Sequence, residues 1–184
     1  EDIWKFFEQY IGENDHIIRT NVVNALSMSY LGSGNTSVVS KLLSIIATDV
    51  SSDVRRSAVI GLTMVMLNKR SKAISLLSML SSSYNGYVRH AVALCLGLIS
   101  VHTFDKKVTK IVRKLFEDKV DYVRQAAAIS LGLIYQLGND QIEPSFEAIR
   151  KSLIERLERK HEHALSKFGC VMGLALTNPG GGNC

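Results

Sequence analysis

A basic residue followed by small and apolar residues recurs along this 184-residue chain at an almost constant interval. The five basic positions, spaced by 36, 34, 35 and 43 residues, are Arg19, Arg55, Arg89, Arg124 and Lys167. A period near 35 residues is typical of proteins that stack a two-helix unit on copies of itself. This repeat constrains the possible fold strongly, because every copy must bury its apolar face against a neighbouring copy.

The residues within each repeat have the periodicity of α-helices. Val54, Ala58, Leu62 and Val65 are three or four residues apart, so they form one apolar face of a helix. A stripe of the same period precedes them in residues 39–46. Each repeat therefore predicts a helix, a turn and a second helix. The predicted repeats are approximately residues 1–32, 33–68, 69–103, 104–138 and 139–178.

The stacked hairpins predict an all-α fold, an α-solenoid of about five helical hairpins that forms a single helical-repeat domain over residues 1–184. The second helices carry glycines that include Gly97, Gly132 and Gly173. Glycine inside a helix costs about 1 kcal/mol relative to alanine. Repeated glycine at this cost predicts that adjacent second helices approach each other closely.

Residues at the ends of the predicted second helices have the types found at helix caps. The residues expected to cap free N–H groups at the starts are Asp53, Asn85 and Asp121. The glycines expected in the left-handed conformation after the ends are Gly32, Gly138 and Gly180.

The composition is that of a globular protein, with 46% hydrophobic and 21% charged residues and a formal net charge of +5. The apolar runs are too short for a membrane helix, so no membrane partner is expected. Cys95, Cys170 and Cys184 lack the spacing of a disulfide framework or a zinc site. Cysteines of this kind favour a reducing compartment, and we expect the cytoplasm and the nucleus.

Six short segments match one family in the same order. They are residues 32–35 (GSGN), 49–56 (DVSSDVRR), 75–78 (SLLS), 122–125 (YVRQ), 167–169 (KFG) and 180–183 (GGGN). With them the chain resembles the proteasome/cyclosome repeat region of the largest non-ATPase subunit of the 26S proteasome regulatory particle base. One departure is Thr63, which stands where Gly97 and Gly132 stand in their repeats.

The resemblance implies HEAT-like proteasome/cyclosome repeats, about ten or eleven of which close into a toroid in that family. This chain is then expected to be an arc of the later repeats and a fragment of a longer chain. The resemblance also implies a non-catalytic scaffold for ubiquitin-dependent protein degradation. The implied partners are the proteasome ATPase and lid subunits, a ubiquitin receptor and a deubiquitinase.

The arginines Arg55, Arg89 and Arg124 could line up as an anion-binding strip. The favoured interpretation is structural: each arginine caps or pairs with an acid of its own or the adjacent repeat, such as Asp53 or Asp121.

The sequence His161-Glu162-His163 resembles the His-Glu pairs with which deoxyhypusine hydroxylase, another helical-repeat protein, holds two irons. Such a site needs pairs at several repeats, but residues 89–90 read Arg-His and residues 124–125 read Arg-Gln. We therefore expect a polar connection at a helix boundary and no metal or other cofactor.

Two predicted first helices are rich in basic residues. On one of them Lys106, Lys110 and Arg113 share a face, and the next carries Arg150, Lys151, Arg156, Arg159 and Lys160. A solvated outer face is favoured, and an acidic protein partner is the alternative. Nucleic acid is not expected, because no aromatic residues interleave with these charges.

No catalytic motif is present in the sequence, so we do not expect an enzyme. The alternative function is a general α-solenoid adaptor of the transport-receptor or coat type. In either case the repeat faces at the two ends favour self-association of this chain.

Overall fold

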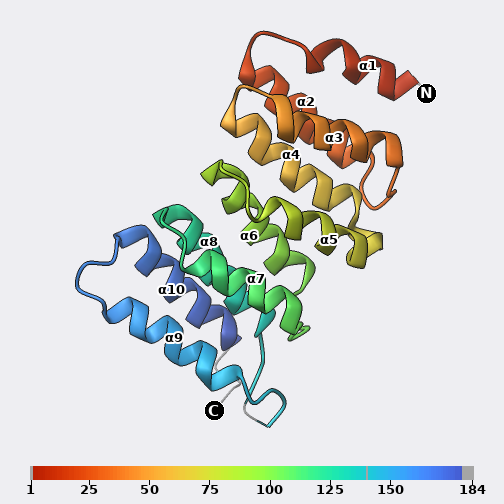
Figure 1. The fold of residues 1–184 in the computed structure, drawn as a ribbon. Coiled ribbons are helices and arrows are strands. Elements are labelled where there is room, and N and C mark those ends of the chain that lie inside the picture. The colour runs from red at the N-terminus through yellow and green to blue at the C-terminus, as the bar shows by residue number, and fades with distance from the viewer. Residues whose placement is uncertain (1, 140, 180–184) are drawn as a thin grey trace. The chain divides into compact units, whose positions relative to one another are not determined.

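The computed structural model describes residues 2–139 and 141–179, and in this part of the chain helices are joined by turns and loops, without strands. The α-helices are α1 (Asp2–Ile11), α2 (His16–Ser29), α3 (Thr36–Thr48), α4 (Ser52–Val65), α5 (Arg70–Leu80), α6 (Gly86–Ile99), α7 (Lys106–Phe116), α8 (Asp121–Ile134), α9 (Phe146–Glu158) and α10 (Ala164–Thr177). A short 3-10 helix, η1 (Leu67–Lys69), precedes α5. Successive α-helices pair into hairpins (Figure 1), which confirms the predicted all-α solenoid fold.

The chain divides into two compact units, residues 1–95 and residues 96–184. The boundary between them falls inside α6. In the first unit α3 packs on α4, and the second helices α2 and α4 lie against each other (Figure 1). In the second unit α7 packs on α8, α9 packs on α10, and α8 and α10 lie side by side. The predicted repeat boundaries each fall between hairpins, and the description as a single domain stays a prediction.

The apolar stripes predicted from the sequence form the core of each unit. Val54, Ala58, Leu62 and Val65 of α4 are all buried. Burying one such valine or leucine side chain stabilises a fold by about 1.5–3 kcal/mol. Packing of these faces therefore holds helices of 10 to 14 residues that would be marginal alone.

The predicted start caps are confirmed at one position of three. The Asn85 side chain accepts from the Tyr87 N–H at 2.9 Å and caps α6 as predicted. Ser51 and Val120 hold the cap positions of α4 and α8, so Asp53 and Asp121 lie inside the first turns instead. A carboxylate in the first turn still interacts favourably with the helix dipole.

Of the glycines predicted to follow second helices, Gly32 and Gly138 are required for different physical reasons. Gly32 has a φ of +67°, as predicted. Gly138 does not take that role; Leu137, with a φ of +56°, adopts the left-handed conformation in its place. A Cβ on Gly138 would lie 2.9 Å from the Phe146 ring, so lack of space requires this glycine. Gly180 lies outside the described residues.

A repeated contact joins successive second helices. The twelfth residue of one helix meets the tenth residue of the next, and the pairs are Ser27 with Gly61, Gly97 with Ser130, and Gly132 with Gly173. A Cβ on Gly132 would lie 2.3 Å from the Gly173 carbonyl oxygen and 2.7 Å from its Cα. Real Cβ atoms essentially never come this close, so the backbones of α8 and α10 touch through their glycines. We call these contacts the second-helix seam.

Thr63, which stands where Gly97 and Gly132 stand in their repeats, still takes part in the second-helix seam. Thr63 is the twelfth residue of α4 and Cys95 is the tenth residue of α6. The Thr63 hydroxyl and the Cys95 thiol both donate to the Val59 carbonyl, at 3.1 and 4.0 Å. Burial raises the pKa of the Cys95 thiol to about 11, although the nearby Thr63 side chain acts in the opposite direction. Cys95 is therefore a neutral packing residue, and the seam here is closed by a Thr–Cys pair without glycine.

Gly132→Ala is expected to destabilise the protein by about 1–3 kcal/mol, because the added methyl group would overlap backbone atoms of Gly173. This loss is expected despite a gain of about 1 kcal/mol in helix propensity. Chemical denaturation followed by circular dichroism measures it. Gly12→Ala is the matched control, since a Cβ on Gly12 would have no atom within 4 Å. Equal stability of both variants would show that α8 and α10 are free to separate.

Candidate functional site

The repeated basic residue is the fourth residue of every second helix, from Arg19 in α2 to Lys167 in α10. In three repeats its Nη1 donates to the two carbonyls that lie six and five residues earlier. The acceptors are Glu13 and Asn14 for Arg19, Ser83 and Tyr84 for Arg89, and Asp118 and Lys119 for Arg124. The arginine thus satisfies the turn inside its own hairpin, where backbone carbonyls would otherwise lack partners.

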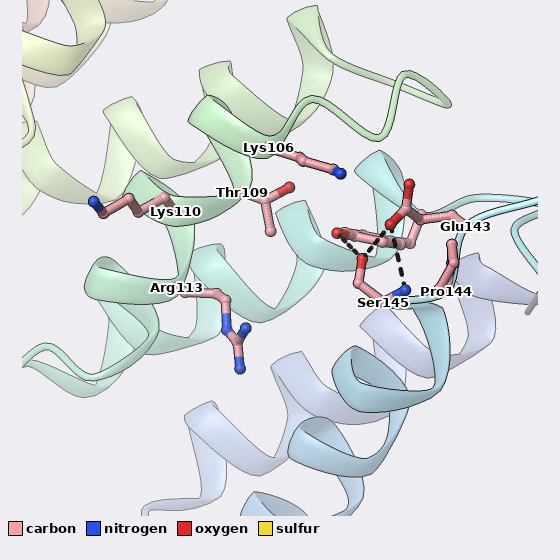
Figure 2. A pocket seen from close by; sticks show the side chains of 8 residues that line it. Lys106, Thr109, Lys110, Arg113, Glu143, Pro144 and Ser145 are labelled. Carbon is pink, nitrogen blue, oxygen red and sulfur yellow. Dashed lines mark hydrogen bonds between the residues drawn. The ribbon is translucent and has the colours of Figure 1, made fainter.

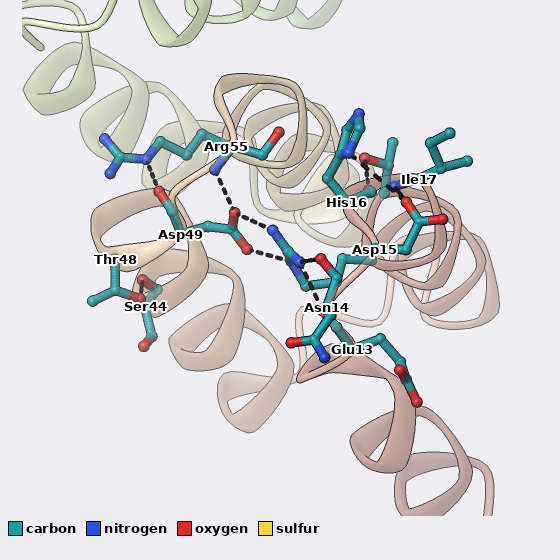
Figure 3. A network of polar contacts seen from close by, with 12 residues as sticks. Glu13, Asn14, Asp15, His16, Ile17, Ser44, Thr48, Asp49 and Arg55 are labelled. Atoms are coloured by element: carbon teal, nitrogen blue, oxygen red, sulfur yellow. Dashed lines mark hydrogen bonds and ion pairs between the residues drawn. The ribbon is translucent and has the colours of Figure 1, made fainter.

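The same guanidinium also reaches the turn of the next hairpin. Arg19 donates from Nε and Nη2 to the two carboxylate oxygens of Asp49, at 3.0 and 3.1 Å. Asp49 also accepts from the Ser51 N–H at 2.8 Å, and its carbonyl accepts from Arg55 Nε (Figure 3). Arg55 in turn donates to the Tyr84 hydroxyl of the following hairpin. The hydrogen bond to Asp49 raises the pKa of Arg19, so this side chain stays charged.

Glu162 is the centre of a buried ion network in the second unit. Its carboxylate lies 2.7 Å from Arg124 Nη2 and 3.0 Å from Arg156 Nη1. The Arg156 side chain is 3% exposed, pairs also with Glu117, and stacks 4.1 Å from the Phe116 ring centroid. Burial opposes ionisation of Glu162, but the two guanidiniums outweigh it and lower its pKa. The network ties α8, α9 and the turn before α10 together.

The structure corrects several sequence expectations about these charges. The acids that pair with the repeated arginines are Asp49 and Glu162, whereas Asp53 pairs with Arg56 and Asp121 with His163. Arg156 was expected on a solvated face and is buried instead. Sequence spacing could not reveal Glu162, because it lies in a turn outside both apolar stripes.

The alternative of an anion-binding strip is not supported, since Arg55, Arg89 and Arg124 all donate to carbonyl, hydroxyl or carboxylate oxygens of this chain. Lys167 is partly exposed, and its backbone N–H donates to the His163 carbonyl. The four arginines hold turns together, as the structural interpretation predicts.

Two residues of the His-Glu-His segment, Glu162 and His163, are occupied by other contacts. Both oxygens of Glu162 face guanidiniums, and His163 Nδ1 lies 2.8 Å from Asp121 Oδ2 and 3.3 Å from the backbone nitrogen of Leu165. Within residues 2–139 and 141–179, no cluster of three His, Cys, Asp or Glu side chains is arranged to hold a metal ion. The thiol of Cys170 is buried, which raises its pKa to about 11 and leaves it protonated.

Two grooves lie on the first-helix side of the hairpins. The first, which we call the basic groove, has a volume of about 560 Å³ and lies between α7 and the segment before α9 (Figure 2). Its lining residues are Lys106, Thr109, Lys110, Arg113, Tyr135, Glu143, Pro144 and Ser145. The second, the apolar groove, has about 580 Å³ between α3 and α5, with Val39, Leu43 and Leu76 among its lining residues. No helix in the described part has the length and apolar character to cross a bilayer.

Comparison with known proteins places these features in a family. The family model for HEAT repeats matches residues 73–166. The chain is 33% identical over 99% of its length to the 26S proteasome non-ATPase regulatory subunit 1 of Caenorhabditis elegans, and 32% identical over 96% to that of Dictyostelium discoideum. It is 31% identical over 94% to the 26S proteasome regulatory subunit RPN2 of Saccharomyces cerevisiae. The chain spans about a fifth of the length of these relatives.

A solved structure supports the fold alone. The crystal structure of an engineered protein superposes with a TM-score of 0.57 at 16% identity, and the match covers 97% of this chain and 80% of that one.

Glu162→Gln is expected to destabilise the protein by about 3 kcal/mol, because it leaves two guanidiniums, one of them buried, without their carboxylate. Urea denaturation at pH 7 measures the loss. Glu155→Gln removes a charge from an exposed position of α9 and is the matched control, with a change within about 0.5 kcal/mol. Similar effects of the two substitutions would contradict a stabilising network.

The effect of Glu162→Gln is also expected to depend on pH. A carboxylate whose folded pKa is lowered contributes stability that is complete above its usual pKa of about 4.3 and disappears as pH falls through the lowered value. The stability difference between the wild type and Glu162→Gln should therefore be constant near neutral pH and shrink below about pH 4. Denaturation curves collected from pH 7 to pH 3 test this, and a difference that stays constant throughout would contradict it.

Proposed function

Because this chain belongs to the HEAT-repeat family and is related over 94–99% of its length to 26S proteasome non-ATPase regulatory subunit 1, we propose that it is part of a non-catalytic scaffold of the 26S proteasome regulatory particle. The observation that carries this proposal is identity of 31–33% along nearly the whole chain in three distant organisms.

The geometry supports a scaffold because its polar groups are used to hold hairpins together. Arg19, Arg124 and Glu162 are engaged in ion pairs and hydrogen bonds within the chain. Small residues fix the distance between second helices, so the first-helix surfaces are presented at set positions within each unit. A protein built in this way acts by positioning its partners, and no bond is made or broken.

The proposed partners are the ATPase and lid subunits of the proteasome, a ubiquitin receptor and a deubiquitinase. Holding these proteins in register would serve ubiquitin-dependent protein degradation in the cytoplasm and nucleus. A general adaptor of the transport-receptor or coat type is the second candidate, because the HEAT-repeat match to residues 73–166 does not by itself specify a particular partner.

Affinity purification of the protein that contains this chain, tagged in its native cells, tests the proposal. We expect ATP-dependent peptidase activity and ATPase subunits in the eluate. Gly132→Leu should remove both by overpacking the seam, and Gly12→Leu, which faces open space, should retain them. An eluate that contains cargo or coat proteins and no peptidase would transfer the function to the adaptor.

A further inference from the structure

We propose that the basic groove binds an extended acidic peptide segment of a partner protein, with Lys106, Lys110 and Arg113 as the residues that contact its carboxylates. The site does not depend on the proteasome role, since it follows from the chemistry of α7 and the segment before α9. The peptide is identified by its chemistry, which is a run with an acidic residue at alternate positions.

The cations of the groove are available for a ligand. Lys110 and Arg113 form no hydrogen bond or ion pair with any residue that the structure describes, and both are exposed. Arg124 and Arg156 of the same unit are each paired with carboxylates. Lys106 lies within electrostatic range of Glu143, whereas Lys110 and Arg113 pair with no acid of the described residues. These two cations repel each other, so a ligand that supplies carboxylates would relieve the repulsion.

The spacing of the cations suits an extended chain. Residues three to four positions apart on a helix are separated along its axis by about 4.5–6 Å. Side chains on one side of an extended peptide repeat about every 6.6–6.8 Å. Acidic residues at alternate positions can therefore each approach one of the three cations, and Arg113 can bind its carboxylate with two parallel hydrogen bonds.

The facing wall of the groove selects a peptide over a nucleic acid. Glu143 is fixed there, because its carboxylate accepts from the Ser145 hydroxyl at 2.8 Å, and that hydroxyl lies 3.0 Å from the Tyr135 hydroxyl (Figure 2). An extended peptide directs successive side chains to opposite sides, so it can present acids to α7 and neutral groups to Glu143. A nucleic acid carries a charge on every phosphate and would be repelled by this carboxylate.

The floor of the groove contains a polar group that lacks a partner. The Thr109 side chain is 7% exposed, and its hydroxyl makes no hydrogen bond to the described residues. A buried hydroxyl without a partner is unfavourable, so a ligand that supplies an acceptor is favoured at this position. A peptide carbonyl that reached this hydroxyl would accept a hydrogen bond from it.

Fluorescence anisotropy of a fluorescein-labelled peptide with four Asp-Ser repeats, titrated with the 184-residue chain, tests the proposal. Lys110→Glu combined with Arg113→Glu should weaken binding at least tenfold. Lys151→Glu combined with Lys160→Glu makes the same change in net charge at exposed positions outside the groove, and it should weaken binding less than twofold. Circular dichroism should show that both double variants are folded, since all four side chains are exposed.

Three results would overturn the proposal. The first is no saturable binding of the Asp-Ser peptide by the wild-type chain. The second is equal weakening by the two double variants, which would indicate only a non-specific effect of net charge. The third is tighter binding of an eight-nucleotide oligouridine or of inorganic phosphate than of the peptide, lost in Lys110→Glu with Arg113→Glu, which would make the groove a phosphate site.

Discussion

The contact between the backbones of successive second helices is the constraint on which the rest of this structure depends. At this seam a twelfth residue meets a tenth residue, and the two together have room for at most small side chains. Gly132 and Gly173 leave no space for even one Cβ, while Ser27 faces Gly61 and Ser130 faces Gly97. The cost of about 1 kcal/mol for each glycine in a helix is offset by the contact surface that close approach brings together.

Close approach of the second helices is also what brings the turns of adjacent hairpins within reach of one side chain. An arginine at the fourth helical residue can then satisfy carbonyls of its own turn and a polar group of the next, as Arg19 does with Asp49 and Arg124 with Glu162. Wider spacing would leave these guanidiniums with only one of the two turns. The glycines and the arginines therefore act together. The glycines set the distance between second helices, and the arginines hold the turns of adjacent hairpins to each other.

The sequence was sufficient to predict the hairpins and the close packing, because periodicity and glycine inside helices are local signals. Thr63 looked like a departure only because its partner was unknown; Cys95 supplies the small residue on the opposite helix. The acids of the arginine network were mispredicted, since Asp49 and Glu162 lie 30 and 38 residues from their partners and sequence carries no signal for that pairing. Arg156 was expected at the surface because of its charge, although it lies three residues after Leu153 and seven after Ile149, on the buried face of α9. There Phe116 and Glu162 contact its guanidinium.

The way this chain uses its residues determines where it can bind other molecules. The small residues of the second helices form the seam, and the repeated arginines pair with carbonyls and acids of the turns. The grooves lie between a first helix and the segment that leads into the next first helix. Their lining residues take part neither in the seam nor in the arginine contacts of the turns. The grooves occupy equivalent places in the two units, yet one is lined by Val39, Leu43 and Leu76 and the other by Lys106, Lys110 and Arg113. A repeat whose internal contacts are fixed while its grooves vary can offer a different chemistry at each hairpin, which is the property that an assembly scaffold for several unlike partners requires.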